Sequence, residues 1–293
     1  MGSPSHELEL SQSSPYAATL IISVYRDIKK LACVLCALSS QSVKNFEVLI
    51  SEDGDSIEMQ EFLSPLLRIN SNFKHLSHPD IGFRKNRALN NAVKAASADL
   101  LIFIDGDCVP HPRFVESHIS NKGDILVSAG RRVELGPIAS KTLVAFPHCF
   151  ALLTNPFLYL IVIPFLALDR VKNPESGIYS KFIQKLSGKK DISVVGCNFS
   201  CSKKMLLKIN GFNNDYEAPG IGEDTDVEWR LREAGYKVNS LKFVAILFHL
   251  YHPRTYQLSS ANVEIYKSTV AGGKLRCENG LSEEIRRDRA ASI

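Results

Sequence analysis

The sequence has little excess charge and no regular spacing of cysteines, and each of these absences argues against one class of protein. Its 293 residues carry a formal net charge of +4, because 35 basic residues face 31 acidic ones, and so small an excess does not by itself indicate nucleic-acid binding. The seven cysteines are odd in number and scattered, which excludes the framework of a small disulfide-rich domain. A thiol-rich chain without an evident secretory signal is expected in the cytoplasm.

Enough apolar sequence is present for a sizeable core. Hydrophobic residues make up 45% of the chain, which argues against global disorder. Cys33 and Cys36 form a C-x-x-C pair inside ACVLCALSS, a stretch with the pattern of an apolar helix face. We expect buried free thiols there, with a redox or metal-binding pair as the alternative. Residues 1–17 are mostly polar and are expected to form a flexible tail.

Strand-like and helix-like segments alternate over the first part of the chain. Strands are expected at residues 18–25, 46–56, 73–78 and 100–105, and the second of these strands ends in acidic residues. Helices are expected at residues 28–42, 57–69 and 82–98, and the second of these helices is expected to break near Pro65. A further apolar strand is expected at residues 241–248. Continuous apolar strands that alternate with helices predict an α/β fold, with a Rossmann-like, mostly parallel sheet flanked by helices in a single catalytic domain.

Three of the expected strands end in polar or acidic residues. The first ends at Tyr25-Arg26-Asp27, the second at Glu52-Asp53-Gly54-Asp55, and the fourth at Asp105-Gly106-Asp107. Ligands of parallel α/β sheets bind beyond the carboxyl ends of the strands. We therefore expect these three strand ends to converge on one crevice.

The D-x-D sequence of Asp105 and Asp107 indicates a metal site. Two carboxylates this close repel one another unless a cation or hydrogen-bond donors lie between them. A divalent metal that carries a diphosphate meets this need, and carboxylate oxygens suit Mg²⁺ or Mn²⁺. An ordinary acidic turn is the alternative, because D-x-D is common by itself. The preceding strand and the second acidic strand end favour the metal.

Five segments occur in a recognisable order, namely LIISVYRD, VLISEDGDS, IGFRKNRALNNA, IFIDGDCVPHPRFVESH and the stretch from VVGCNFS to REAGYKV. Together they resemble the family 2 glycosyltransferases with the glycosyltransferase-A fold, over roughly residues 19–252. The last segment also resembles the C-terminal region of galactosyltransferase-like enzymes, where G-G-E-D lies at the acceptor site. Here Ile221 precedes Gly222, so one glycine of that pattern is replaced.

The resemblance implies a metal-dependent inverting hexosyltransferase. Its donor would be a nucleotide-sugar, expected to be UDP-linked, and its acceptor a saccharide or glycolipid in cell-surface polysaccharide or lipopolysaccharide synthesis. The nucleotide-sugar-binding half would cover residues 18–130, the acceptor-binding half residues 131–260, and a helical tail residues 261–293. The implied donor-binding residues are Val24, Tyr25, Arg26, Glu52, Asp53, Asp55, Arg84, Arg87, Asn90, Asp105, Gly106 and Asn198. Solvated basic residues are the alternative for Arg84 and Arg87, and a turn residue for Asn198; Lys85 is expected to be exposed.

Inverting transfer needs a base that takes the proton of the attacking acceptor hydroxyl, and a carboxylate can serve. The resemblance places this base at Asp224, with Glu223 orienting the acceptor or the sugar. It also implies a metal held by Asp107, Asp105 and His249, with Asp107 the more direct ligand. A surface histidine is the alternative for His249, and His252 is the less favoured ligand. Asp226 is interpreted as a helix cap, and the single tryptophan, Trp229, as core or as a sugar platform.

Residues 143–168 form a long, almost uncharged stretch. A membrane-spanning helix needs about 20 apolar residues, but three prolines interrupt the stretch, and a span here would separate the two halves of one site. We expect an amphipathic or re-entrant segment that makes peripheral contact with the inner face of the cytoplasmic membrane or lines the acceptor groove. A buried helical hairpin or a dimer contact is the alternative. Nearby basic residues that could meet anionic lipids are Lys141, Arg170, Lys172, Lys181, Lys185, Lys189 and Lys190.

Two rival functions fit the sequence less well. A nucleotidyltransferase on a similar fold would need a glycine-rich basic loop after the first strand, and SVYRDIKK contains no glycine. A noncatalytic nucleotide-sugar-binding or scaffold protein that kept the fold is the second rival, and the intact acids at Asp53, Asp105, Asp107 and Asp224 argue against it. No binding to nucleic acid is expected, and the sequence leaves the oligomeric state open.

Overall fold

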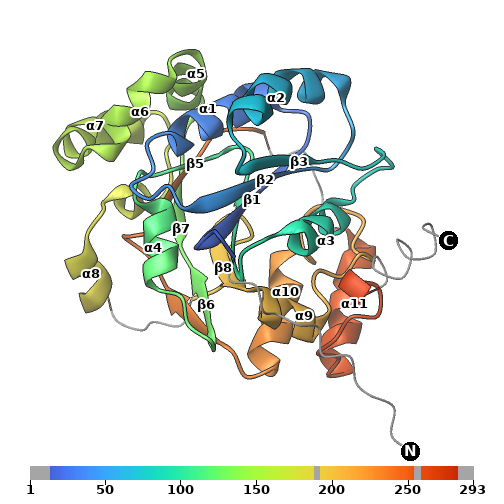
Figure 1. Ribbon diagram of the computed structural model, residues 1–293. Coiled ribbons are helices and arrows are strands. Elements are labelled where there is room, and N and C mark those ends of the chain that lie inside the picture. Colours follow the sequence, from blue (N-terminus) through green and yellow to red (C-terminus); the bar gives the residue numbers. More distant parts are fainter. Residues whose placement is uncertain (1–13, 188–191, 254–258, 283–293) are drawn as a thin grey trace, which may run out of the picture.

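A computed structural model describes residues 14–187, 192–253 and 259–282. Within these residues the main sheet has seven strands (Figure 1). Their order across the sheet is β3 (Phe73–Leu76), β2 (Phe46–Glu52), β1 (Ala18–Val24), β4 (Leu100–Asp105), β8 (Phe199–Ser202), β6 (Leu126–Ala129) and β9 (Lys237–Ser240). β8 runs antiparallel to its neighbours β4 and β6, while the other pairings are parallel. The predicted mostly parallel α/β sheet is thus confirmed.

A smaller sheet of three strands extends from the end of the main sheet, in the order β5 (Cys108–Pro110), β10 (Ile246–His249) and β7 (Arg131–Glu134). β10 lies between the other two, antiparallel to β5 and parallel to β7. Because β5 follows directly after Asp107, this sheet brings the end of β10 to the D-x-D sequence. His249 is paired in register with Cys108.

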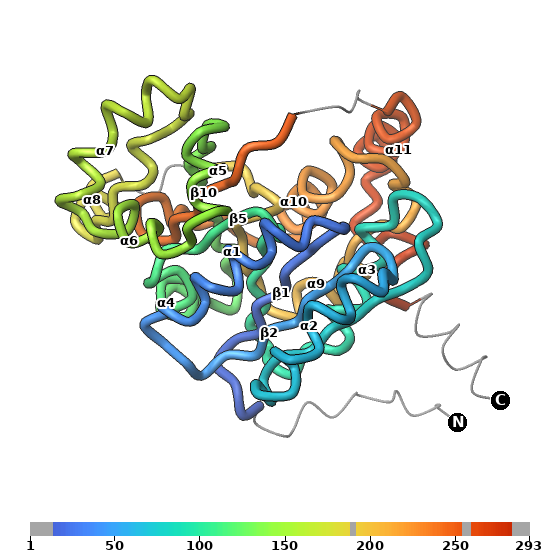
Figure 2. Tube along the Cα trace, turned by 90° about the horizontal axis from the view of Figure 1, so that it is seen from above, coloured from blue at the N-terminus to red at the C-terminus, as the bar shows by residue number. Residues whose placement is uncertain are grey.

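Helices cover both faces of the main sheet (Figures 1 and 2). On one side lie α1 (Ile28–Leu38), α2 (Ile57–Ile69), α4 (Phe114–Ser120), α5 (Pro137–Ala145), α6 (Phe150–Thr154) and α7 (Pro156–Leu168). On the other lie α3 (Lys85–Ala95), α9 (Lys203–Ile209) and α10 (Asp224–Glu233). The remaining helices are α8 (Lys181–Leu186), α11 (Ser260–Ala271) and the short 3₁₀ turns Pro147–Cys149 and Pro174–Gly177.

The central strands β1 and β4 are mostly apolar because both of their faces are buried. In β1, Leu20, Ile22 and Val24 belong to the core beneath α1 and α2, whereas Ile21 faces the core beneath α3 and α9. Strand side chains alternate between the two faces of a sheet, so a strand covered on both sides needs apolar residues at every position. This burial explains the continuous apolar runs in the sequence.

Several element boundaries differ from those expected. Helix α2 continues through Pro65 to Ile69 instead of breaking there. The strand expected at residues 241–248 is only β10, because a turn precedes it in which Phe243 has a left-handed φ of 71°. The expected tail at residues 1–17 lies mostly outside the described residues, although the amide of Ala17 already donates to Asn45 O. Of the C-terminal tail, residues 283–293 lie outside the described part of the chain.

The apolar stretch forms the separate group α5–α7, at one end of the molecule in both views (Figures 1 and 2). In the described parts of the chain, no single helix is both long and apolar enough to cross a bilayer. Pro147–Thr154 and Pro156–Leu168 reach that length and composition only together, with a bend of 104° between them. The predicted interruption by proline is therefore present at Pro156.

Candidate active site

The carboxyl ends of β1, β2 and β4 meet at one cavity, as predicted. Ser23 is paired in register with Asp105, and Val24 with Glu52. The cavity has a volume of about 520 Å³. It is lined by Ser23, Val24, Tyr25, Asp27, Lys30, Asp53, Gly82, Phe83, Lys85, Asp105, Gly106, Asp107, His249 and His252.

Gly106 lies where β4 ends, at a point where the chain passes close to β1. The amide of Gly106 donates to Ser23 O over 2.7 Å. A Cβ at this position would lie 3.0 Å from two side-chain carbons of Val24 and 3.3 Å from Ser23 O. The glycine therefore permits the close approach that places Asp105 and Asp107 on either side of it, at the mouth of the cavity.

Asp107 meets two histidines from the end of β10 and the residues after it. Asp107 Oδ2 lies 3.5 Å from His249 Nε2 and 3.4 Å from His252 Nε2. The three potential ligand atoms all lie within 4.8 Å of one another. Burial acts to raise the pKa of Asp107, but the hydrogen bond and charge of His249 and the charges of His252 and Lys30 outweigh it and hold the pKa at about 2. Asp107 is therefore a carboxylate at any physiological pH.

Asp105 has a different partner, Lys85, which sequence reasoning placed at the surface. Lys85 Nζ lies 2.9 Å from Asp105 Oδ1 and 3.1 Å from the carboxylate of Glu223, and its side chain is only 17% exposed. Burial opposes the charge of Lys85, but the two carboxylates dominate and raise its pKa well above the usual value. The expectation of an exposed lysine was wrong, because both partners lie far from Lys85 in the sequence.

Lys85 thereby joins the two acidic motifs of the chain. Burial raises the pKa of Glu223, Lys85 opposes this rise, and the neighbouring Asp105 and Asp224 add to it. A second pocket of only about 10 Å³ shares Ser23, Lys85 and Asp105 with the cavity and is also lined by Glu223 and Asp224. The D-x-D sequence and the Gly-Glu-Asp sequence, predicted to serve donor and acceptor, therefore lie on either side of one lysine.

Asp224 is the first residue of α10 and faces the loop before β8. Its Oδ2 accepts from the amide of Gly196 over 2.9 Å, and its Oδ1 accepts from the amide of Thr225 over 2.8 Å. A Cβ at Gly196 would lie 3.3 Å from the Cβ of Asp224, so the loop is in close contact with this side chain. Gly222 has a φ of 127° and faces the ring of Tyr216, so this glycine of the pattern is structurally required.

The predicted nucleoside-binding residues form the opposite wall. Asp53 accepts from His78 Nε2 over 2.9 Å and from the amide of Arg84 over 3.0 Å, and it still lines the cavity. Tyr25 is exposed and also lines the cavity. Arg26 has a left-handed φ of 57° and pairs with Asp80 outside the lining.

Other predicted donor-binding residues have structural partners and do not line the cavity. Glu52 is buried, and one of its carboxylate oxygens accepts hydrogen bonds from the amide and the hydroxyl of Ser56, just before α2. Its other carboxylate oxygen pairs with His75 Nε2. Asp55 accepts from Gln60 and Ser77. The side chain of Arg84 pairs with Glu217. Arg87 lies on α3 outside the cavity lining.

Two predicted donor contacts are buried asparagines that fasten distant segments together. Asn90 donates to Phe212 O over 2.8 Å and accepts from the Phe212 amide. Asn198 donates to Arg131 O and Ala245 O, and its Oδ1 lies 3.3 Å from His118 Nε2. Both are fully buried. Their geometry indicates support of the loops behind the site, and it offers no contact with a ligand in the cavity.

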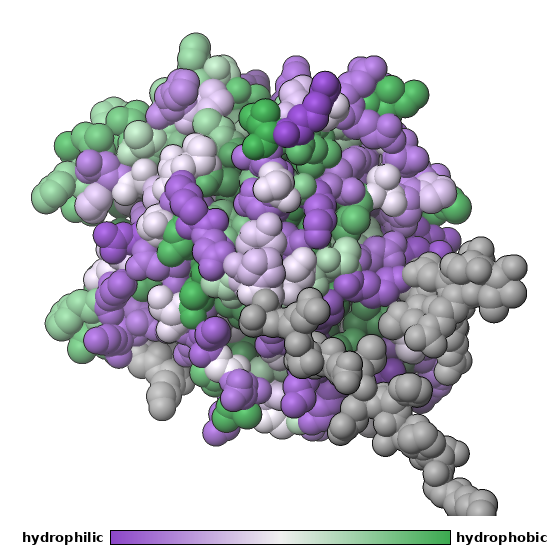
Figure 3. Space-filling view, in the orientation of Figure 1, coloured by the Kyte–Doolittle hydropathy of each residue, from purple (hydrophilic) through white to green (hydrophobic). Residues whose placement is uncertain are grey.

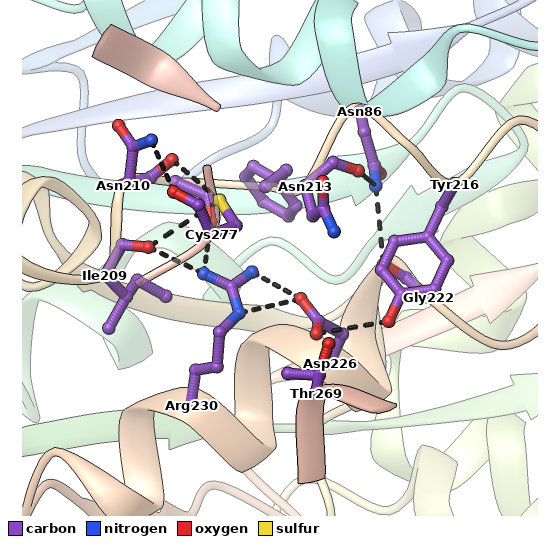
Figure 4. Close-up of polar contacts among 12 residues, drawn as sticks. Asn86, Ile209, Asn210, Asn213, Tyr216, Gly222, Asp226, Arg230, Thr269 and Cys277 are labelled. Carbon is purple, nitrogen blue, oxygen red and sulfur yellow. Dashed lines mark hydrogen bonds and ion pairs between the residues drawn. The ribbon is translucent and has the colours of Figure 1, made fainter. Parts of the chain in front are cut away.

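Asp226 is part of a buried ion pair and does not cap α10, which begins at Asp224 (Figure 4). Its Oδ2 pairs with Arg230 one turn later, and both side chains are completely buried. Tyr216 donates to Asp226 Oδ1, and Arg230 also donates to Ile209 O and Gly211 O. Trp229, half-buried on the same helix, lies outside both described core clusters and outside the cavity lining.

The thiol expectation is confirmed in part. All seven cysteines lie in described parts of the chain and are free, and Cys33 is buried while Cys36 is exposed. Burial raises the pKa of Cys33 to about 11. Cys33 is therefore held as a neutral thiol and lacks the reactive thiolate of a redox site.

Comparison with known proteins finds two family models that match separate parts of the chain. Residues 19–142 match the family model described as glycosyl transferase family 2, and residues 178–253 match the model described as the N-terminal domain of galactosyltransferase. Chondroitin synthase of Escherichia coli is 26% identical over 102 residues, which are 34% of this chain and 15% of that protein. Hyaluronan synthase of Pasteurella multocida is 28% identical over 106 residues, 35% of this chain and 10% of that protein. The matched segment is thus a small part of these longer relatives.

Two solved structures have the same fold. The mannosyltransferase PcManGT from Pyrobaculum calidifontis, in complex with GDP-Man and Mn²⁺, superposes with a TM-score of 0.53 at 12% identity, covering 83% of this chain and 61% of that one. GalNAc-T7 with UDP, GalNAc and Mn²⁺ superposes with a TM-score of 0.59 at 12% identity, covering 87% of this chain and 48% of that one. The resemblance drawn from the sequence is confirmed: one part of the chain matches the glycosyl transferase family 2 model, a second part matches the galactosyltransferase model, and the chain has the glycosyltransferase-A fold.

Proposed function

We propose that this protein is a metal-dependent inverting glycosyltransferase that moves a sugar from a UDP-sugar to a hydroxyl of a saccharide or glycolipid. The observation that carries the proposal is the group of Asp107, His249 and His252 at the mouth of the cavity beyond the parallel strands. This is the position at which α/β sheets bind nucleotides. The family match and the nucleotide-sugar complexes of the structural neighbours support the same assignment.

The donor set of the proposed metal site fits a divalent ion. One carboxylate that stays ionised and two imidazoles converge from separate segments, with room in the cavity for further ligands. Mg²⁺ is held almost entirely by oxygen ligands, so the two imidazoles count against it. Mn²⁺ suits the carboxylate and phosphate oxygens of the site and is present in both structural neighbours, so we propose Mn²⁺ as the resident ion. Asp107, His249 and His252 would hold it, with Asp105 beside them. A bound ion supplies charge stabilisation for the departing nucleoside diphosphate.

The side chains around the cavity divide the remaining work. Tyr25 and Asp53 would contact the nucleoside on one wall. Lys30 also faces the cavity and offers positive charge to phosphate oxygens. Asp224 would accept the proton of the acceptor hydroxyl, and the amides of Gly196 and Thr225 orient its carboxylate in the small pocket beside Lys85 and Asp105. Glu223 would orient the acceptor from its place beside Lys85.

The test is calorimetric titration of the purified protein with UDP, GDP and CDP, in the presence of Mn²⁺ and of a chelator. We expect Mn²⁺-dependent binding of UDP that Asp107→Asn abolishes. Asp124→Asn, which removes an exposed carboxylate away from the cavity, should bind normally. Asp224→Asn should keep nucleotide binding and lose sugar transfer. If the wild-type protein binds no nucleotide with metal present, the enzyme assignment fails and a scaffold protein is the better description.

Binding without turnover has a separate meaning. A wild-type protein that binds a UDP-sugar but neither transfers nor hydrolyses it would be a noncatalytic nucleotide-sugar-binding protein. A panel of UDP-sugars with released UDP as the readout distinguishes the two. Assembly of a cell-surface glycan at the cytoplasmic face of the membrane is the setting we propose for the active enzyme.

A further inference from the structure

One end of the molecule carries exposed apolar residues that take no part in the site described above. On α7, Phe157, Leu160, Ile161, Phe165 and Leu168 recur every three or four residues and therefore lie on one helix face. The fractions exposed range from 57% for Leu160 to 84% for Leu168. Isolated apolar residues on a surface are ordinary, but a continuous helix face of this kind indicates an interaction site.

The opposite face of α7 anchors it to the fold. Tyr159 and Leu166 are buried, and the Tyr159 hydroxyl donates to Pro174 O over 2.6 Å. The Tyr159 ring lies 5.9 Å from the ring of Phe248 in β10. The outward face of α7 is therefore held in place by packing on its inner side.

Helix α8 presents a second apolar surface at the same end of the molecule in both views (Figures 1 and 2). Phe182 and Leu186 are exposed, and Lys181 and Lys185 lie among them on the same short helix. The space-filling view shows apolar surface over α5–α7 and again over α8 (Figure 3). We call the exposed residues Phe157, Leu160, Ile161, Phe165, Leu168, Phe182 and Leu186 the apolar platform.

The charges around the platform indicate what it contacts. Between residues 137 and 187 the basic residues are Lys141, Arg170, Lys172, Lys181 and Lys185, all exposed, whereas the acidic ones are Asp169 and Glu175. From other segments, Glu134 pairs with Lys172 over 3.8 Å and Glu116 with Lys181 over 3.7 Å, so the cations still outnumber the acids. Asp169 is buried and accepts from the amides of Ile138 and Ala139, so it contributes little negative charge to the surface. An apolar surface bordered by cations is complementary to a bilayer with anionic head groups.

The geometry excludes a simple span. Thirteen residues of α7 measure about 20 Å, shorter than the roughly 30 Å of a bilayer's hydrocarbon core. The sharp bend before α7 and the anchoring of its inner face keep it along the side of the domain. We propose that the apolar platform docks on the surface of an anionic bilayer, with α7 and α8 inserted at the level of the head groups.

Vesicle flotation tests this docking with the full chain and does not depend on enzymatic activity. Vesicles of phosphatidylcholine alone are compared with vesicles that also contain phosphatidylglycerol. We expect the protein to float with the anionic vesicles and to bind the neutral ones more weakly. Leu160→Glu/Phe165→Glu should abolish flotation. Lys181→Glu/Lys185→Glu should weaken it by roughly tenfold or more, since each cation near an anionic surface contributes.

Matched controls separate docking from unfolding. Ile69→Glu places the same charge at another apolar residue, 80% exposed at the end of α2, and should float like the wild type. All of these positions are exposed, so the urea midpoints of the variants should match that of the wild type. Equal flotation of Leu160→Glu/Phe165→Glu and the wild type would overturn the proposal. So would a wild-type protein that ignores both vesicles and is a dimer in light scattering, with that variant a monomer, because the platform would then be a contact between copies.

Discussion

Lys85→Met tests whether one cation positions the two acidic motifs. The change removes two charged hydrogen bonds, of 2.9 Å to Asp105 and 3.1 Å to Glu223, from a side chain that is 17% exposed. Hydrogen bonds to charged groups contribute about 1.5–3 kcal/mol each. Without Lys85 the two carboxylates also repel one another. A loss of about 3 kcal/mol from transition-state stabilisation corresponds to a decrease of kcat/KM on the order of 100-fold.

The assay measures release of UDP from the UDP-sugar that the wild-type protein uses. Lys237→Met, which removes an exposed lysine on β9, is the matched control and should behave like the wild type. A pH profile gives a second readout, because Lys85 opposes the raised pKa of Glu223, and its removal should move the acidic limb of kcat/KM to higher pH. A change in kcat/KM below about threefold, with the pH profile unmoved, would refute the positioning role.

Three further predictions concern the framework of the site. Asp226→Ala leaves Arg230 charged and buried without its partner, so the free energy of unfolding in urea should fall by about 3–5 kcal/mol. The double variant Asp226→Leu/Arg230→Met should recover most of this loss. If Asp226→Ala is as stable as the wild type, the ion pair contributes nothing to stability. Burial lowers the pKa of His118 to about 3, so the folded state keeps it neutral while the unfolded chain takes up a proton near pH 6.5. The free energy of unfolding should therefore fall by about 2 kcal/mol more in the wild type than in His118→Gln between pH 6.5 and pH 5, and parallel pH curves would contradict this. Gly106→Ala brings a Cβ to 3.0 Å from Val24, so Mn²⁺ affinity measured by calorimetry should fall about tenfold, and unchanged affinity would mean that β4 adapts at no cost.

The sheet and its convergent strand ends could be predicted from the sequence because both follow from local pattern. Continuous apolar runs indicate strands buried on both faces, and parallel strands bring their carboxyl ends to one edge. Asp53, Asp105 and Asp107 could be placed at the cavity for this reason alone. The cavity lining at Val24, Tyr25 and Gly106 follows from the same argument.

The roles of individual polar side chains could not be predicted in the same way. Glu52 and Asn90 look like ligand contacts in the sequence, but their partners come from segments that only the folded chain brings near. Lys85 lies beside Glu223 although 138 residues separate them. His252 joins Asp107 for the same reason, and its spacing of three residues from His249 is the signal in the sequence that indicates it. Sequence pattern shows where a polar residue leaves a strand, and long-range packing decides what it meets.

The excursion that carries α5–α7 closes on itself where it leaves the smaller sheet. Glu134 and Lys172 exchange backbone hydrogen bonds of 2.9 and 3.0 Å, and Asp169 holds the first amides of α5. These hydrogen bonds hold the two ends of residues 135–171 side by side. The outward-facing side chains of this closed loop can change without moving β7 or β10, whereas inward-facing ones such as Tyr159, which packs on Phe248, belong to the core that holds β10 and His249. The outer face of the loop can therefore be adapted to a different surface while the framework of the proposed site is kept.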